Sequence, residues 1–323
     1  MRRRDFITII GGATVACPFA AMAQEPGRTY RLGVLVPFPR DAPVFLRFLD
    51  ELRHQGFIEG QNLTIDYRDF ALHGDLSSEY AAELVKAQVD VIWAGGGVPI
   101  RAAQQATKTI PIFGVTNDMV GEGLVASLTR PNGNTTGGSM FATELDGKRQ
   151  EILNEAVPGL RRMAALADSN VETDEKLKAL KDAARARNVE LSIYRIARPE
   201  EISSAIDAAK ASGATALNVL GSPMLFGDRQ VVMDRVAVLR LPAIYEIPEM
   251  AEEGGFVAYG PRFSWIPELC ARLAVKLFRG IKVADIPIEQ PTKFELVINL
   301  KTAKAIGVTV PEALLVRADK VIE

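Results

Sequence analysis

The chain has 323 residues, of which 48% are hydrophobic and 24% charged, a mixture typical of globular proteins that bury a full core. Its formal net charge of −2 provides no basic field for nucleic acid or an anionic membrane. Of its two cysteines, Cys17 lies in a segment that we expect to be removed, which leaves one thiol and no internal disulfide. We expect that remaining thiol, Cys270, to be a small buried residue of a helix.

The first 23 residues have the pattern of an export signal. Three arginines precede an apolar stretch over residues 6–21, and the small-x-small pattern at 21–23 predicts cleavage after Ala23. The order Arg-Arg-x-Phe-Ile at 3–7 resembles a bacterial twin-arginine signal, which implies a periplasmic protein. An uncleaved membrane anchor is an alternative, although the stretch is shorter than the ~20 residues that span a bilayer. A lipoprotein site at Cys17 is another, although Thr14 stands where an aliphatic residue is expected.

Short apolar runs alternate with amphipathic helical patterns in the first half of the chain. The runs predict strands at residues 30–36, 63–67, 89–94, 110–115 and 135–140. The helical patterns lie at residues 44–56, 79–88, 99–107 and 124–128.

The same alternation restarts in the second half. Predicted strands follow at residues 163–167, 190–195, 214–220, 243–245, 256–259 and 294–299. Predicted helices follow at residues 145–156, 174–187, 200–211, 229–239, 267–278 and 300–306. Repeated strand–helix units of this length indicate parallel sheets with helices on both faces.

Two successive sets of about five strands predict an α/β protein with two doubly wound parallel-sheet lobes. No Gly/Ser-rich linker separates the sets, so we expect three hinge crossovers near residues 136–143, 259–261 and 287–294. The first lobe would then comprise residues 28–140 and 260–287. The second would comprise residues 141–259 and 288–323. Ligands of such sheets bind in the crevice at the carboxyl ends of the strands.

Signatures of enzymes and metal sites are missing from the sequence. His54 and His73 are the two histidines, and neither has a His or Cys at metal-ligand spacing. No Gly-x-Ser-x-Gly elbow and no phosphate-binding loop of the Gly-x4-Gly-Lys-Ser/Thr type is present. The carboxylates are scattered without a defensible acid–base pair. We therefore expect no catalytic residue, no metal and no cofactor.

The run Gly95-Gly96-Gly97 comes directly after a predicted strand. Ile100 stands where a dinucleotide fingerprint needs its third glycine, which disfavours a nucleotide loop. Glycines here would let backbone N–H groups approach a ligand at a helix start. A tight turn without a ligand would need the same residues.

Several stretches of the sequence belong together. They are RDFI at 4–7, GLVASLTRPNGN at 123–134, PAIYE at 242–246, GGFVAYG at 254–260, QPTKFELVINLKTAKAIG at 290–307 and RADKVIE at 317–323. Together they resemble the ABC transporter substrate-binding family that includes tryptophan- and tyrosine-binding lipoproteins. The resemblance implies a type I periplasmic-binding-protein fold that captures a small solute, such as an amino acid, for the permease of an ABC importer.

The departures from the family pattern lie in the loops expected to hold the ligand. Members often have Gly-Gly-Thr-Pro after the third strand, whereas this chain has Val98 in place of the threonine. Members often have Gly-Asp-Pro after the fourth strand, where this chain has Asn117-Asp118-Met119. A turn with Ser-Asp-Pro in the family is Gly221-Ser222-Pro223 here, which loses a carboxylate.

A binder of this type holds its ligand between loops of both lobes and closes around it. We expect the ligand-binding residues to come from strand ends and from one hinge. They are Phe38, Gly96, Gly97, Thr116, Asn117 and Asp118 of the first lobe, Asp168, Ser169, Asn170, Ser222, Tyr245 and Glu246 of the second, and Tyr259 at the hinge. Structural roles compete with binding for several of these. Asp168 or Ser169 could cap a helix, Tyr245 could belong to the sheet core, and Tyr259 could only pack the hinge.

Other functions remain open at the level of the sequence. A periplasmic sensor subunit that signals through a membrane receptor needs the same closing cleft. A regulator of the Lac-repressor type shares the lobes, but no DNA-binding helix pair precedes Tyr30. We expect a monomer whose partners are the small ligand and a permease, without nucleic acid.

Overall fold

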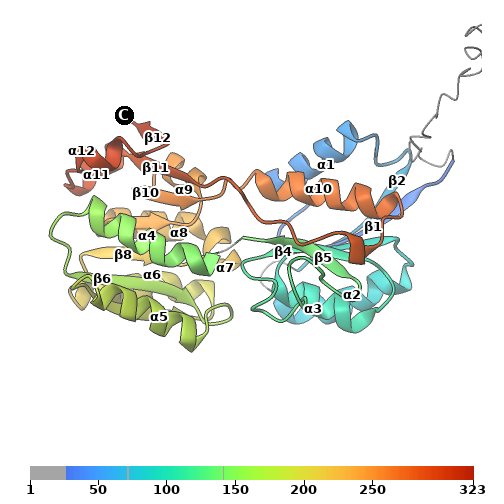
Figure 1. Cartoon of the computed structure of the whole chain (residues 1–323), viewed down its shortest axis with the longest axis horizontal. Helices are drawn as coiled ribbons and strands as arrows, with labels where there is room; N and C mark the ends of the chain where they lie inside the picture. Colours follow the sequence, from blue (N-terminus) through green and yellow to red (C-terminus); the bar gives the residue numbers. More distant parts are fainter. Residues whose placement is uncertain (1–26, 71–72, 141) are drawn as a thin grey trace, which may run out of the picture.

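The computed structural model describes residues 27–70, 73–140 and 142–323, and shows two α/β lobes side by side (Figure 1). The predicted export signal lies outside these residues. Within the described part of the chain, no helix has the length and apolar character needed to cross a membrane.

The first lobe is built on a five-stranded sheet in the order β2-β1-β3-β4-β5, with every neighbouring pair parallel. Its strands are β1 (Tyr30–Val36), β2 (Leu63–Asp69), β3 (Val91–Ala94), β4 (Ile112–Thr116) and β5 (Thr135–Ser139). Its helices are α1 (Pro43–His54), η1 (Gly74–Leu76), α2 (Ser77–Lys86), α3 (Gly97–Ala106), α10 (Trp265–Phe278) and η3 (Val283–Asp285).

Helices cover both faces of this sheet, as Figure 1 shows. Leu32, Val34 and Val36 of β1 pack towards α1 and α10, whereas Leu35 packs towards α2 and α3. Such burial on both faces explains why the strands read as continuous apolar runs rather than as alternating ones. Cys270 is fully buried in α10, as expected.

The second lobe is built on a seven-stranded sheet in the order β12-β11-β10-β9-β8-β6-β7. Its strands are β6 (Arg162–Asp168), β7 (Glu190–Ile196), β8 (Ala216–Val219), β9 (Ala243–Tyr245), β10 (Val257–Gly260), β11 (Glu295–Asn299) and β12 (Lys320–Ile322). All neighbouring pairs are parallel except β10 and β11, because β11 enters the sheet from the direction of the first lobe.

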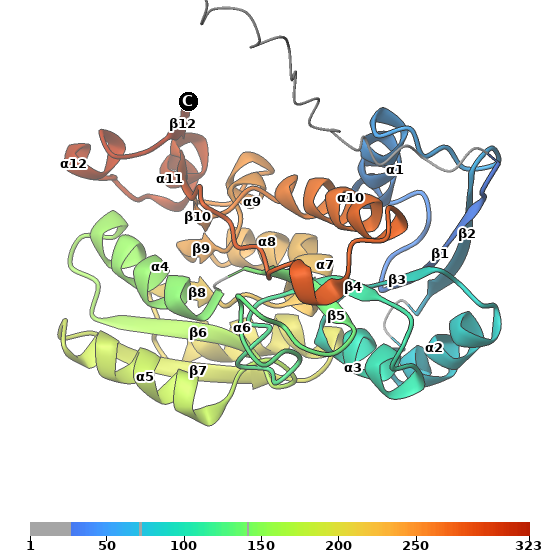
Figure 2. The same cartoon turned by 45° about the vertical axis from the view of Figure 1, so that its right-hand side comes forward.

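Two hydrophobic cores lie on opposite faces of the second sheet. Figure 2 shows the helices that cover this sheet. One core includes residues of α4 (Ala142–Ala156), α5 (Asp174–Arg185), α11 (Leu300–Ile306) and α12 (Glu312–Leu315). The other includes residues of α6 (Ile202–Ala211), α7 (Pro223–Gly227), α8 (Arg229–Val238) and α9 (Pro248–Glu252), with η2 (Pro199–Glu201) leading into α6.

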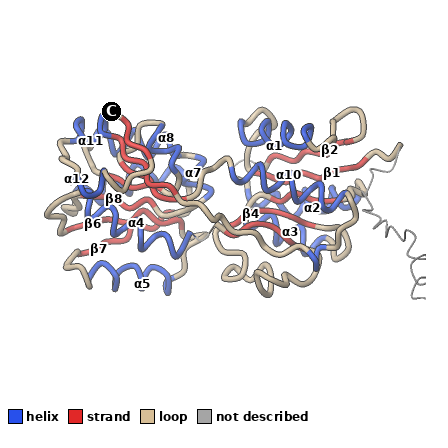
Figure 3. The backbone as a smooth tube through the Cα atoms, turned by 45° about the horizontal axis from the view of Figure 1, so that its top comes forward, coloured by secondary structure: helices blue, strands red, loops and turns tan. Residues whose placement is uncertain are grey.

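The chain passes between the lobes three times, through the narrow middle of the molecule (Figure 3). The passages lie between β5 and α4, between β10 and α10, and between η3 and β11. Arg262 in the second passage binds Glu252 and Glu295 of the second lobe. Glu289, at the start of the third, binds Arg272 and Lys276 of α10. Ion pairs therefore anchor these two passages to the lobes that they connect.

The helix expected at residues 124–128 is wrong. The chain between β4 and β5 forms a series of turns, in which Leu124 and Val125 are buried. Gly123 and Gly133 adopt positive φ angles of 68° and 69°, and Pro131 restricts the residue before it, so a short apolar run here packs as a loop. The short elements α7, α9, α12 and β12 were not expected, because three to five residues are too few to show a period.

Candidate functional site

The two lobes contact each other where the ends of strands meet. Asn117 follows β4 and Gly221 follows β8, and Asn117 Nδ2 donates a hydrogen bond of 2.8 Å to the carbonyl oxygen of Gly221. Loops that follow the strands of a parallel sheet lie at one edge of it, so other strand-end residues share this region. We call it the interlobe contact.

Three glycines connect β3 to α3 on the first-lobe side. Gly96 is the N-cap of α3 and has φ of 101°, a conformation that side-chain-bearing residues rarely adopt. Gly97 begins the helix, and both residues are partly exposed. The first N–H groups of a helix attract negative charge, so this start could bind an anion.

A carboxylate of the protein itself already lies at this helix start. Glu122 Oε2 is so close to Gly97 that a Cβ atom on Gly97 would overlap it. Glu122 Oε1 accepts a hydrogen bond of 3.2 Å from the backbone N–H of Asp118. Burial raises the pKa of Glu122, and Lys176 of the second lobe is one of the groups that offset this rise.

The other first-lobe residues expected at the site have mainly local partners. The partly exposed ring of Phe38 lies 6.1 Å from that of Trp93. Thr116 is buried at the end of β4, and its hydroxyl faces Glu122 without a well-formed hydrogen bond. Asp118 Oδ1 accepts a hydrogen bond of 2.8 Å from the N–H of Gly121, so Asp118 stabilises its own turn.

Ser222 is central to the second-lobe side. Its hydroxyl donates to Asp168 Oδ2 at 2.6 Å and accepts from the N–H groups of Met224 and Leu225, which caps α7. Ser222 and Asp168 are only 2% and 3% exposed. The N–H of Ser222 also lowers the pKa of Glu246, which places that carboxylate beside the same residue.

Ser169 and Asn170 are exposed and bind the end of β7 rather than the facing lobe. The N–H of Ser169 donates to the carbonyl of Ile196 at 2.7 Å. Asn170 Nδ2 donates to the carbonyl of Ala197 at 3.2 Å. Both residues therefore fix the loop that Asp168 begins.

Two tyrosines expected at the site differ in their surroundings. Tyr245 is fully buried in the hydrophobic core that includes α8 and α9, so it belongs to the sheet core. Its hydroxyl finds no hydrogen-bond partner among the described residues. Tyr259 is partly exposed, and its ring lies 6.4 Å from that of Phe294 beside the passages between the lobes.

A buried ion pair lies beneath the second-lobe side. Arg149 and Asp146, both in α4, are 2.7 Å apart, and their side chains are 1% and 5% exposed. Arg149 Nε also donates to the carbonyl of Tyr259 at 3.2 Å. Burial raises the pKa of Asp146 to about 6, although Arg149 lowers it in part.

Two further carboxylates share this region. Burial raises the pKa of Glu172 to about 7, and the nearby carboxylates of Asp146 and Asp168 raise it further. Burial likewise raises the pKa of Glu246 to about 7, with Arg149 as the main offsetting charge. Burial therefore disfavours the charged form of both carboxyl groups.

The residues expected from the sequence do not include five that lie in this region, Glu122, Asp146, Arg149, Glu172 and Lys176. Glu122 and Glu172 each follow the end of a strand by a few residues, a signal that could have identified them. Asp146 and Arg149 share one face of a helix at i,i+3 spacing, which by itself looks like a surface pair. Only the packing of α4 under the strand ends shows that they are buried.

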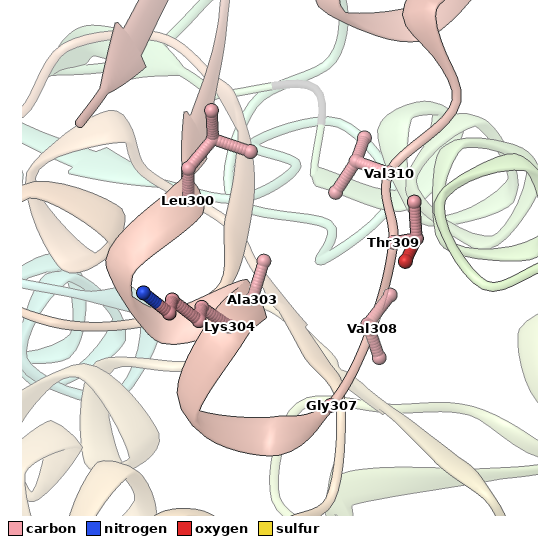
Figure 4. A pocket seen from close by; sticks show the side chains of 7 residues that line it. All are labelled: Leu300, Ala303, Lys304, Gly307, Val308, Thr309 and Val310. Carbon is pink, nitrogen blue, oxygen red and sulfur yellow. The ribbon is translucent and has the colours of Figure 1, made fainter.

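No cluster of His, Cys, Asp and Glu in the described parts of the chain has the geometry to hold a metal ion. An open pocket lies away from the interlobe contact, between α11 and the segment after it (Figure 4). Its lining is Leu300, Ala303, Lys304, Gly307, Val308, Thr309 and Val310. Mostly aliphatic and backed by one short helix, it offers no convergent polar groups for a specific ligand.

The chain is similar in sequence to known solute-binding proteins. Residues 43–322 match the family model described as ABC transporter substrate binding protein. The chain is 28% identical over 267 residues to a tyrosine-binding protein of Clostridioides difficile (strain R20291), which covers 80% of this chain and 75% of that protein.

Two solved structures share the fold at 22% identity, each covering 91% of this chain and 100% of its own. One is an ABC domain from Streptococcus pneumonia in complex with L-Trp, with a TM-score of 0.80. The other is a conserved domain protein from Vibrio cholerae, with a TM-score of 0.81.

Proposed function

Because the chain belongs to the family of ABC transporter substrate binding proteins, we propose that it captures an amino acid or a related small solute between its lobes and delivers it to an ABC importer. The family consists of solute-binding proteins rather than enzymes. The tyrosine-binding relative and the L-Trp complex support a small amino compound as the ligand.

The hydrogen bond between Asn117 and Gly221 is the observation that carries this proposal. It joins residues 104 positions apart, one from each lobe, at the strand ends where open α/β sheets bind ligands. A bond of this kind forms only when the lobes approach each other. It therefore supports a mechanism in which closure brings both sets of loops onto the ligand.

In this mechanism the protein alternates between open and closed arrangements, and the ligand binds the closed one more tightly. The ligand then shifts the population towards closure, and the permease recognises the closed lobes. The lobes would move relative to each other about the three passages that connect them. Ion pairs anchor two of these passages.

A thermal-shift screen with amino acids, amines, small organic acids and purines tests this proposal. A solute that binds only the folded protein raises its unfolding temperature, by an amount that grows with concentration. We expect at least one such solute. The absence of any stabilising solute across all four classes would contradict the proposal.

The proposal includes export, with the mature protein in the periplasm as a monomer that begins at Gln24. Mass spectrometry of periplasmic material should find this N-terminus. Recovery of the protein in a membrane fraction with Met1 retained would contradict export with cleavage.

A further inference from the structure

The start of α3, which could hold the carboxylate of a ligand, is taken by the carboxylate of Glu122. Glu122 Oε2 fills the space beside Gly97, and Glu122 Oε1 is bound by the N–H of Asp118. A second anionic group in the same place would overlap the Glu122 carboxylate and meet a like charge, which is unfavourable.

The loop that carries Glu122 is held firmly in this position. The N–H of Glu122 donates to the carbonyl of Asp118 at 2.9 Å, and that of Leu124 donates to the carbonyl of Met119 at 3.0 Å. Gln104 Nε2, from α3 itself, donates to the carbonyl of Leu124 at 2.7 Å. The loop is thereby tied to the helix whose start it covers.

Carboxyl groups also outnumber cationic side chains among the residues described at the interlobe contact. The carboxylates described above are those of Asp118, Glu122, Asp146, Asp168, Glu172 and Glu246. Arg149 is engaged by Asp146 and by the carbonyl of Tyr259. Lys176 is shared, since it acts on Glu122, Asp146 and Glu172 together.

Two other arginines near these residues bind the backbone carbonyls of Glu122 and Glu172 and not their carboxylates. Arg101 donates to the backbone carbonyl of Glu122 at 2.7 Å. Arg195 donates to the backbone carbonyl of Glu172 at 3.2 Å and pairs with Asp174. Burial is the main cause of the raised pKa values of Glu172 and Glu246, and a cation bound beside them would favour their charged forms.

We infer that the interlobe contact selects a small organic cation that has no carboxylate, such as an amine, and that Glu122 is the residue that discriminates against amino acids. This inference rests on the proposed function and narrows its ligand class. The ammonium group of the ligand would lie near the carboxylates of Asp168 and Glu246, which are beside Ser222, and near that of Glu172. The rest of the ligand lies towards the first lobe, where a carboxylate would meet Glu122.

Matched pairs of compounds test the inference directly. Each pair is an amino acid and the amine left when its carboxylate is removed: tyrosine and tyramine, tryptophan and tryptamine, lysine and cadaverine, arginine and agmatine. Isothermal titration calorimetry on the full protein should show that the amine binds more tightly than the amino acid in every pair that binds. We expect the dissociation constants of amine and amino acid to differ by about tenfold or more, because the amine avoids one contact between like charges.

Glu122→Ala opens the space beside Gly97 at the start of α3 and should reduce that preference about tenfold, because a carboxylate of the ligand can then approach the positive end of the helix. Glu122→Gln removes the charge but keeps the size of the side chain, so it separates repulsion from steric filling. Glu155→Ala is the matched control, because Glu155 is exposed on α4 and pairs with Arg317. It should leave the preference unchanged.

The outcomes separate this inference from the proposed function. An amino acid that binds the wild type more tightly than its amine overturns the inference and leaves the proposed function standing. The same holds if only a solute without an amine stabilises the protein in the wider screen. If Glu122→Ala folds and keeps the full preference for amines, the role of Glu122 is wrong. If no solute of any class binds, both fail.

Discussion

The two sides of the interlobe contact are built from different groups. On the first-lobe side, Gly96, Asn117 and Asp118 are partly exposed and belong to turns. On the second-lobe side, Asp168 and Ser222 are at most 3% exposed and are hydrogen-bonded to each other. We expect the second side to be rigid and tied to folding, and the first side to tolerate the loss of single side chains with less effect on stability.

We expect the largest loss of stability from removal of the Arg149 side chain, which lies on the rigid second-lobe side. Arg149→Ala leaves Asp146 buried without its ion-pair partner, and breaking such a pair typically costs about 3–5 kcal/mol of unfolding free energy. Urea denaturation measures this loss. Arg185→Ala is the control, since Arg185 pairs with Asp182 at the same i,i+3 spacing on an exposed surface. It should cost about 1 kcal/mol or less. Equal losses in the two variants would contradict the comparison.

Removal of the Ser222 hydroxyl should have the next largest effect. Ser222→Ala deletes the cap of α7 and leaves Asp168 Oδ2 without its short hydrogen bond. We expect a loss of about 1–3 kcal/mol in unfolding free energy. In Ser169→Ala the backbone bond to Ile196 survives, so its stability should stay near that of the wild type. A Ser222→Ala protein of wild-type stability would show that this side is less rigid than described.

The stability of the ligand-free protein should fall as the pH rises from about 4.5 to above 7. The pKa of Glu172 is raised from 4.5 to about 7 in the folded protein, because burial disfavours its charge. The folded state therefore keeps a proton that the unfolded state releases over this range, so the free energy of unfolding decreases with pH. Glu246 and Asp146 contribute in the same direction.

Denaturation of wild type and Glu172→Gln at several pH values checks this effect. The variant cannot ionise at position 172, so its stability should depend less steeply on pH. A decline that is as steep in Glu172→Gln as in the wild type would exclude Glu172 as a contributor.

Asn117→Ala should have the smallest effect on stability and a selective effect on binding. Its side chain bridges the lobes, so its loss weakens closure by about 0.5–1.5 kcal/mol, or roughly two- to tenfold in affinity. Asn170→Ala removes a similar bond to a carbonyl, but within the second lobe, and should leave affinity unchanged. Calorimetry with the ligand from the screen compares the two. Equal affinities in both variants would contradict a bridging role.

The sequence predicted the fold well because apolar runs and helical periods are local. β1 and β9 have the predicted bounds, and the two lobes with parallel sheets are confirmed. The helix at 124–128 failed because two buried apolar residues do not distinguish a helix from a packed loop. Tyr245 illustrates a similar limit. The strand that carries it was predicted correctly, but the sequence does not show which face of the sheet its side chain points to.

The candidate site was less accessible to sequence reasoning, because it depends on which loops meet. Asn117 and Ser222 were selected as strand-end residues, and the structure brings Asn117 to the residue before Ser222. Nothing in the sequence indicates that Glu122 folds back onto Gly97, since that contact depends on turns between β4 and β5. The burial of Arg149 likewise depends on where α4 packs.

Small-angle X-ray scattering with and without the best ligand from the screen tests the central claim most directly. If the ligand is held between the lobes, saturating ligand should lower the radius of gyration of the wild type, and Asn117→Ala should need more ligand for the same decrease. A radius of gyration that does not change at saturation, in a protein that calorimetry shows to be fully bound, would contradict capture by closure of the two lobes.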